Sequence, residues 1–153
     1  FKIITPKNEY NAKAVIIATG STPKRAGFEG EEEFIGRGVS YCAVCDGFFY
    51  KDKIVAVIGG GDTALEEALY LSKIAKKVYL IHRRDKFKAS PFTQKKVFET
   101  ENIEIIFNAT VKKVFGNQFV EGIILNLKGS EKILKVDGVF VFVGLKVNNE
   151  LVK

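Results

Sequence analysis

The sequence has no methionine, no tryptophan and no long apolar run, and only two cysteines and one histidine among 153 residues. Without an apolar run of about 18 residues a membrane-spanning helix is excluded, and we expect neither a signal peptide nor a membrane partner. Two cysteines are too few for the disulfide framework of a small secreted protein. These absences predict a soluble, cytoplasmic domain that is long enough for one hydrophobic core.

The first residues also lack an expected start. The chain opens on Phe1, inside an apparent strand over residues 1–5, and no methionine occurs at any position. These two features predict that the sequence is a piece of a longer protein.

The charge is unbalanced, with a net value of +6 and a pI near 9.2. Such an excess of positive charge is typical of nucleic-acid binders when it gathers on one face or one helix. Here the basic residues are spread along the chain, and the one dense cluster combines Arg83 and Arg84 with Lys86 and Lys88. We therefore expect no nucleic-acid partner.

The hydrophobic pattern predicts buried strands, and helices between some of them. Apolar, β-branched runs predict buried strands at residues 14–18, 54–58, 78–81, 103–107 and 139–143. Helical spacing predicts helices over residues 62–76 and 91–100. A strand, helix and strand in direct succession form a parallel βαβ unit.

The region between the last two of these strands has a different period. Residues 111–115, 119–127 and 132–136 alternate between apolar and polar, and Gly-containing turns separate them. This pattern predicts an antiparallel meander. The fold class expected for the whole is α/β, a Rossmann-like, three-layer, NAD(P)-binding domain whose parallel sheet carries an inserted antiparallel β-meander.

A glycine-rich turn joins the strand at 54–58 to the helix at 62–76. In a dinucleotide-binding turn the first glycine permits the tight turn, the second lets phosphate approach the backbone, and the third position must be small. Gly59, Gly61 and Ala64 occupy these positions, and the pyrophosphate is expected over the helix N-terminus. A purely structural glycine turn is the alternative. The residues predicted to contact the cofactor here are Gly59, Gly60, Gly61, Asp62, Thr63 and Ala64.

Cofactor choice is expected at the end of the next strand, where NAD-binding proteins carry an acidic residue for the ribose hydroxyls. This sequence has His82, Arg83 and Arg84 there, with Lys88 close behind. Two guanidinium groups suit the 2′-phosphate of NADPH, which an acidic residue would repel. The alternative is a solvated basic turn.

Both cysteines lie in one Cys-x-x-Cys motif, formed by Cys42 and Cys45. Such a pair binds zinc, forms a structural disulfide, or cycles between dithiol and disulfide. Zinc needs about four ligands, and the only histidine belongs to the basic motif, so no metal is expected. A structural disulfide that closes so short a loop stabilises little, which favours redox cycling. Asp46 follows directly and is interpreted either as a proton donor and acceptor or as a helix-capping or turn-capping residue.

Three motifs in this order, CAVCDG at 42–47, GGGDTALEEA at 59–68 and HRRD at 82–85, resemble the NADPH domain of low-molecular-weight bacterial thioredoxin reductase. The resemblance implies electron flow from NADPH to FAD, then to the disulfide, then to thioredoxin. Cys45 would face the flavin, Cys42 would attack the thioredoxin disulfide, and Asp46 would be the acid/base. Lys88 stands where that family often has arginine. The full-length enzyme would be a homodimer.

The flavin-binding motifs of that family have no counterpart in this sequence. The resemblance thus implies that residues 1–20 and 145–153 lead to and from an FAD domain, and that residues 21–144 form the NADPH domain. We expect the chain alone to bind NADPH but not FAD, and to be inactive without the flavin. Alternatives are an NADPH- and thiol-sensing domain without turnover, a purely structural interaction domain, and the related NADH-linked peroxiredoxin reductase.

Overall fold

The structure is a computed structural model that describes residues 1–152. The chain divides into two units. The core unit is Pro23–Gly144, and the terminal unit combines Phe1–Thr22 with Leu145–Lys153. Each unit is described separately.

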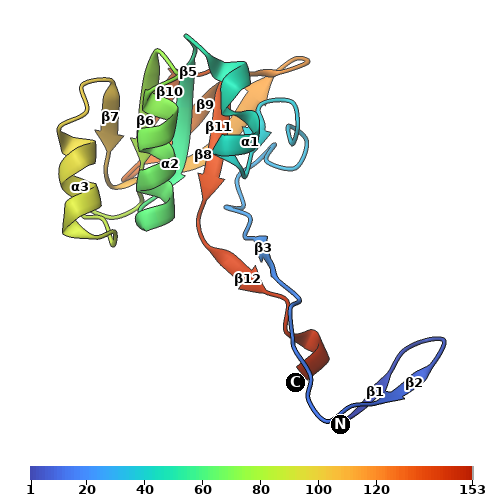
Figure 1. Ribbon diagram of the computed structural model, residues 1–153. Coiled ribbons are helices and arrows are strands. Elements are labelled where there is room, and N and C mark those ends of the chain that lie inside the picture. The colour runs from blue at the N-terminus through green and yellow to red at the C-terminus, as the bar shows by residue number, and fades with distance from the viewer. Residues whose placement is uncertain (153) are drawn as a thin grey trace. The chain divides into compact units, whose positions relative to one another are not determined.

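A five-stranded parallel sheet forms the centre of the core unit (Figure 1). Its strand order is β4-β11-β5-β6-β7. The strands are β4 (Val39–Ser40), β11 (Gly138–Phe142), β5 (Ile54–Gly59), β6 (Lys77–Ile81) and β7 (Ile103–Ile106). The chain connects β5 to β6 through α2 (Asp62–Ser72), and β6 to β7 through α3 (Pro91–Phe98). These are the crossover helices that parallel neighbours require.

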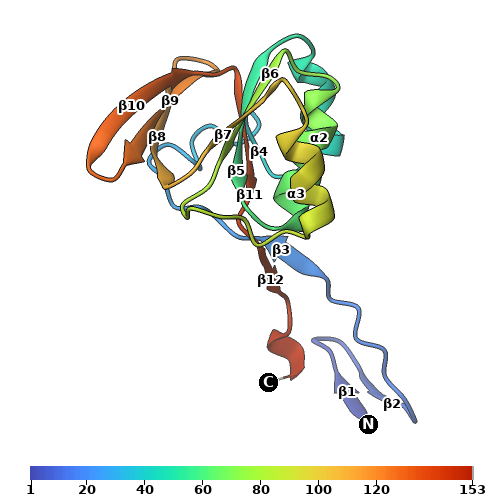
Figure 2. The same cartoon turned by 90° about the vertical axis from the view of Figure 1, so that its left-hand side faces the viewer.

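The other two layers lie on opposite faces of this sheet (Figure 2). Helices α2 and α3 cover one face, and the antiparallel strands β8 (Ala109–Gly116), β9 (Val120–Leu127) and β10 (Ser130–Lys135) cover the other. Successive side chains of a strand point to opposite faces. Accordingly, Val55 and Val57 of β5 pack in the helix-side cluster, and Ala56 and Ile58 in the meander-side cluster. The predicted three-layer fold is confirmed.

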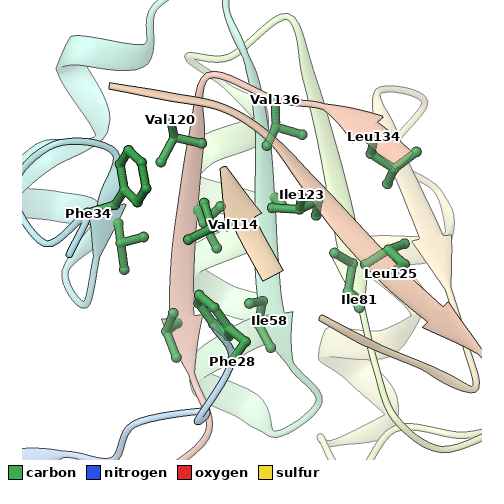
Figure 3. Close-up of a cluster of buried hydrophobic side chains, with 14 of the residues drawn as sticks. Phe28, Phe34, Ile58, Ile81, Val114, Val120, Ile123, Leu125, Leu134 and Val136 are labelled. Atoms are coloured by element: carbon green, nitrogen blue, oxygen red, sulfur yellow. The ribbon is translucent and has the colours of Figure 1, made fainter. Parts of the chain in front are cut away.

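The meander-side core explains why an antiparallel insertion remains attached to a parallel sheet. Val114 of β8 and Ile123 and Leu125 of β9 are at most 1% exposed and pack with Ile58 and Ile81 of the parallel strands (Figure 3). Burial of this apolar surface is the main stabilising contribution to the layer.

Two short elements follow β4 at the edge of the sheet. α1 (Ala43–Asp46) is followed without a break by the 3-10 helix η1 (Gly47–Tyr50), and both precede β5. Gly47, at their junction, lies against Tyr70 and Leu71 of α2, because a Cβ there would come within 3.2 Å of both side chains. α2 therefore contacts the α1–η1 segment near one end and begins at the glycine turn at the other.

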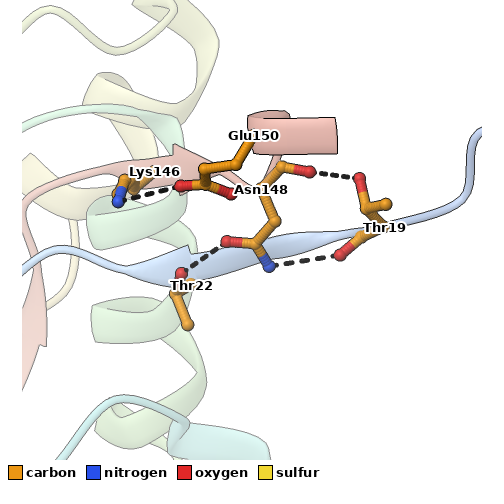
Figure 4. A network of polar contacts seen from close by, with 5 residues as sticks. All are labelled: Thr19, Thr22, Lys146, Asn148 and Glu150. Carbon is orange, nitrogen blue, oxygen red and sulfur yellow. Dashed lines mark hydrogen bonds and ion pairs between the residues drawn. The ribbon is translucent and has the colours of Figure 1, made fainter. Parts of the chain in front are cut away.

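The terminal unit contains two small two-stranded sheets. β1 (Lys2–Ile4) pairs with β2 (Glu9–Asn11), β3 (Ser21–Pro23) pairs with β12 (Leu145–Val147), and η2 (Glu150–Val152) follows. Asn148 joins the two stretches of this unit (Figure 4). Its side chain donates to the Thr19 carbonyl at 3.1 Å and accepts from the Thr22 hydroxyl at 2.9 Å.

Two sequence expectations need correction. The predicted buried strand at 14–18 is neither a strand nor buried, and Ile16 is 93% exposed. A strand needs a hydrogen-bonded neighbour, and none of the described segments pairs with these residues. The helix predicted to run to residue 76 ends at Ser72, where the Lys73 and Ile74 N–H groups bond three residues back, to the Tyr70 and Leu71 carbonyls. The Asn102 side chain donates to the Ser72 and Ala75 carbonyls at 2.8 and 3.2 Å.

Candidate nucleotide and disulfide sites

The glycine turn begins with a close approach between strand β5 and helix α2. A Cβ on Gly59 would lie 2.5 Å from the Ala64 Cβ and 2.5 Å from the Phe142 carbonyl oxygen. Ala64 itself is fully buried. Any larger side chain at either position would push the helix off the sheet, so the structure gives the first and third positions of the motif the roles predicted for them.

The second position of the motif is open instead of crowded. Gly61 is the N-cap residue of α2, and a Cβ there would meet no atom within 4 Å. Glycine has no side chain that could accept the N–H groups of the first helical turn, and no side chain caps this helix. Exposed backbone donors and the positive end of an 11-residue helix therefore meet at one point, which suits a phosphate.

Two backbone N–H groups of residues 83–90 donate hydrogen bonds to this turn. The Lys88 N–H donates to the Gly60 carbonyl at 2.7 Å, and the Ser90 N–H donates to the Asp62 carboxylate at 2.7 Å. The predicted phosphate-binding turn and the predicted basic segment are thus brought together. Asp62, predicted as a cofactor contact, uses its carboxylate as the acceptor of this bond; Thr63 next to it is exposed.

Arg83 and Arg84 follow β6 after one intervening residue, His82, and are both exposed. Among residues 1–152 no ion pair involves them or Lys88. Their charge is therefore available to an anionic ligand.

His82 has a different position from the arginines that follow it. Only 8% of it is exposed, and its ring packs against Phe87 and Phe107. Burial lowers its pKa below 6.5, and the charges of Arg84 and Arg83 lower it further, against hydrogen bonds with the backbone of Lys86 and Gly59. A direct contact with phosphate stays a prediction for this residue, whereas its place beneath the glycine turn is observed.

Cys42 and Cys45 form a disulfide with a Cα–Cα distance of 5.3 Å. Cys42 is the N-cap residue of α1, and its Sγ accepts a hydrogen bond from the Cys45 N–H at 3.2 Å. Cys42 is half-buried and Cys45 is exposed. The disulfide is therefore accessible to a partner. Cys42 Sγ is the sulfur that accepts the backbone hydrogen bond.

Asp46 ends α1 and makes its closest polar contact with the sheet. Its Oδ2 accepts a hydrogen bond from the Ser40 hydroxyl at 2.6 Å. Although Asp46 is also the N-cap residue of η1, its side chain makes no capping hydrogen bond there. The capping interpretation is wrong for this residue, and its carboxylate is held beside the disulfide turn.

A second buried polar group precedes the disulfide. Glu31 is 3% exposed, and its carboxylate accepts hydrogen bonds from the Ala26 N–H at 2.9 Å, the Gly27 N–H at 2.6 Å and the Tyr41 hydroxyl at 2.6 Å. The Arg25 guanidinium lies 4.6 Å from the centre of the Tyr41 ring. These contacts fix the residue immediately before Cys42.

Comparison with known proteins decides the family. A model of the pyridine nucleotide-disulphide oxidoreductase family matches residues 3–153. The chain belongs to this family. The oxidoreductase family name pairs a pyridine nucleotide with a disulphide, the two groups for which the core unit has candidate sites.

Several proteins similar to this chain are thioredoxin reductases. The chain is 52% identical to that of Helicobacter pylori over 94% of its length, and 48% identical to that of Listeria monocytogenes over 95%. It superimposes on the Lactococcus lactis thioredoxin reductase with a TM-score of 0.93, at 39% identity over 99% of the chain. It spans about half the length of these relatives, 47% of each sequence and 51% of the solved chain.

Exposed apolar side chains near the disulfide in sequence were not predicted. Val44 lies between the two cysteines, Phe48 and Phe49 follow in η1, and the three are 67%, 75% and 70% exposed. The apolar run after Asp46 is visible in the sequence. Hydropathy alone would place such a run in the core, so it does not predict that these side chains are exposed. The contact of Ser40 with Asp46 gave no sequence signal, because it depends on how β4 and α1 pack in space. No helix among residues 1–152 is long and apolar enough to cross a membrane.

Proposed function

We propose that this chain is the nucleotide-binding and disulfide-carrying half of a thioredoxin reductase. In the full-length protein electrons would pass from NADPH through FAD to the Cys42–Cys45 disulfide, and then to thioredoxin. The observation that carries the proposal is that one domain holds both a dinucleotide-type glycine turn and an accessible disulfide. The resemblance to thioredoxin reductases at 48–52% identity supports it.

The residues present fit a nicotinamide dinucleotide. Gly61 leaves room for a pyrophosphate at the N-terminus of α2, where backbone N–H groups would bind it, and Gly59 and Ala64 let the helix pack closely on β5. Arg83 and Arg84, with Lys88, would bind the 2′-phosphate that distinguishes NADPH from NADH. Thr63 lies in the same exposed turn and would add a hydroxyl donor.

The residues present do not fit a flavin. The single glycine turn between strand and helix is the one assigned to NADPH, and the chain spans about half of its relatives. We propose that FAD binds in the other half of the full-length protein, which residues 1–20 and 145–153 would join. Bound there, the flavin would relay the hydride electrons that a disulfide does not readily accept directly.

The chain's own groups would carry the last step. Two electrons and two protons convert the Cys42–Cys45 disulfide to two thiols. The Cys42 thiolate then attacks one sulfur of the thioredoxin disulfide and releases the other as a thiolate, which takes a proton. Cys45 attacks Cys42 Sγ next, which restores the disulfide and releases the second thioredoxin sulfur. Asp46 would donate and accept the protons.

The geometry supports this division of labour between the cysteines. The Cys45 N–H already points at Cys42 Sγ, and such a donor stabilises a thiolate on Cys42. The exposed Phe48 and Phe49 would give thioredoxin an apolar docking surface beside the disulfide. We propose a cytoplasmic, homodimeric enzyme for the full-length protein, with no nucleic-acid or membrane partner.

A trapping experiment tests the proposed partner and the proposed nucleophile. The Cys45→Ser chain, reduced beforehand, is mixed with a bacterial thioredoxin that keeps one cysteine of its disulfide, capped as a mixed disulfide with thionitrobenzoate, and the disulfide-linked product is measured on a non-reducing gel. The Cys42 thiolate displaces thionitrobenzoate and should accumulate as a stable mixed disulfide with thioredoxin, because neither protein then holds a second thiol that could release it.

The matched control is the Cys42→Ser chain, which should trap at least about tenfold less. Replacing Phe48 and Phe49 by Ser in the Cys45→Ser chain should slow trapping. Equal trapping by the two cysteine variants, or none by either, would contradict the proposal.

A further inference from the structure

We propose that Ser40 is a positioning residue for the thiol–disulfide exchange, acting through Asp46. The inference rests on the proposed function, in which Asp46 moves protons to and from the sulfurs. Ser40 does not touch the disulfide itself. Its effect comes from the orientation that its hydroxyl imposes on the Asp46 carboxylate and on the Cys42 backbone.

Ser40 has a fixed place in the sheet. It ends strand β4, where it is paired in parallel register with Phe140 of β11, and only 6% of it is exposed. Phe140 is fully buried in the helix-side core. The Ser40 backbone is therefore held by the best-packed part of the domain, while its side chain points along the chain towards α1.

The hydroxyl of Ser40 has one proton and two nearby acceptors. The Asp46 Oδ2 lies 2.6 Å from Ser40 Oγ, and the Cys42 carbonyl oxygen lies 3.3 Å from it. The shorter distance and the charge of the carboxylate both direct the proton to Asp46. The second bond is at most a weak alternative.

The same oxygen also accepts a hydrogen bond. The Cys42 N–H donates to Ser40 Oγ at 3.1 Å. Ser40 Oγ thus accepts a hydrogen bond from the Cys42 N–H and donates its own proton to the Asp46 carboxylate. The two bonds connect the Cys42 amide to Asp46 through Ser40. One buried side chain thus connects the backbone of the proposed nucleophile to the proposed acid/base.

Loss of the hydroxyl would remove the hydrogen bond that fixes the orientation of the Asp46 carboxylate. A proton donor works only within hydrogen-bond reach of the atom it serves, and a small displacement slows the reaction roughly ten- to a hundredfold. The Cys42 N–H would lose its acceptor at the same time. If Ser40→Ala merely destabilised the fold, it would slow the exchange equally with Asp or Asn at position 46. If Ser40 positions Asp46, Ser40→Ala should slow the exchange only while Asp46 is present.

A double-mutant cycle separates these two outcomes. The chemically reduced chain is mixed with oxidised thioredoxin and, separately, with a small aromatic disulfide, and the exchange rates are measured for wild type, Ser40→Ala, Asp46→Asn and the double variant. We expect Ser40→Ala and Asp46→Asn each to slow exchange by roughly tenfold or more, and the double variant to be no slower than Asp46→Asn. Ser40→Thr, which keeps the hydroxyl, should recover most of the rate.

Multiplying effects in the double variant would overturn the proposal, as would a wild-type rate for Ser40→Ala or for Asp46→Asn. Failure of the wild-type chain to reduce thioredoxin would contradict the proposed function instead. In that case the rates with the small disulfide still decide the role of Ser40. Urea unfolding of all four chains shows whether each is folded under the conditions of the assay.

Discussion

The imidazole of His82 lies directly against the backbone of Gly60. A Cβ added to Gly60 would come within 2.2 Å of the His82 Nδ1 atom and 2.3 Å of its Cε1. The middle glycine of the turn is therefore required by a buried side chain of the protein, whereas Gly61 faces open space. The two neighbouring glycines have separable roles.

Gly60→Ala should destabilise the fold. The methyl group can be accommodated only if the buried imidazole or the turn moves, and overpacking of this kind costs about 1–3 kcal/mol. Urea unfolding measures the loss. A free energy of unfolding within about 0.5 kcal/mol of wild type would contradict the close approach of these two residues.

Gly61→Ala is the matched control, with the same chemical change one residue later. We expect its unfolding free energy to stay within about 0.5 kcal/mol of wild type, since no atom lies near the added methyl group. Its affinity for NADPH should nevertheless fall by tenfold or more, because the methyl group occupies the space through which phosphate approaches the helix N-terminus. Unchanged affinity would argue against a pyrophosphate at this turn.

His82 should make the fold less stable in acid. Its pKa in the folded state is lowered below 6.5, mainly by burial, so the unfolded chain binds a proton more readily than the folded chain. Stability is therefore present above pH 6.5 and decreases as the pH falls below it. As the only histidine, it gives one imidazole signal by NMR. That signal should titrate below pH 6.5 in the folded chain, and a midpoint at or above 6.5 would contradict the burial.

Tyr41 should produce a second pH dependence, in the alkaline range. Burial, together with its hydrogen bond to Glu31, raises the pKa of Tyr41 from 10.0 to about 12. The folded chain holds the phenolic proton more tightly than the unfolded chain, so this stabilisation is complete below pH 10 and is lost as the pH rises towards 12. Spectroscopic titration of tyrosinate in wild type and Tyr41→Phe should differ by one group with a pKa near 12. A difference centred at pH 10 would contradict the contact.

Glu31 should matter more for stability than its surface-loop setting suggests. Glu31→Ala leaves two backbone N–H groups and the Tyr41 hydroxyl without their acceptor. These donors are only partly buried, so their loss of an acceptor predicts a destabilisation of about 1–3 kcal/mol. Glu32→Ala, next in the chain but exposed, is the control and should change stability by less than about 0.5 kcal/mol. Equal, small effects of the two substitutions would contradict the buried network.

The regular core of this fold follows directly from its sequence. Residues 54–58 form a continuous apolar run followed by glycines, and β5 and its turn lie there. The change to period-two alternation from residue 111 predicted the meander, whose first strand, β8, begins at Ala109. Both signals are local, because they depend on which faces of one strand are buried. The Gly59–Ala64 contact could be predicted for the same reason, since the motif spacing itself specifies it.

The features that sequence analysis missed depend on contacts between distant segments. Residues 14–18 have the composition of a buried strand, yet no described segment pairs with them. Glu31 reads as part of a charged loop, and its burial depends on Tyr41 ten residues away. His82 belongs to a basic motif by position, but its ring packs inward against Gly60. Composition does not report which partner a polar side chain will find.

The central claim is that the turn at Gly59–Ala64 and the arginines at 83 and 84 form one NADPH site. Calorimetric titration of the chain with NADPH and with NADH tests it most directly. NADPH should bind at least about tenfold more tightly, and Arg83→Ala/Arg84→Ala should remove that preference, because charged hydrogen bonds contribute about 1.5–3 kcal/mol each. Lys132→Ala/Lys135→Ala, which removes two exposed charges from β10, should keep the preference. Equal affinities for the two nucleotides, binding of neither, or a preference that survives loss of both arginines would contradict the account.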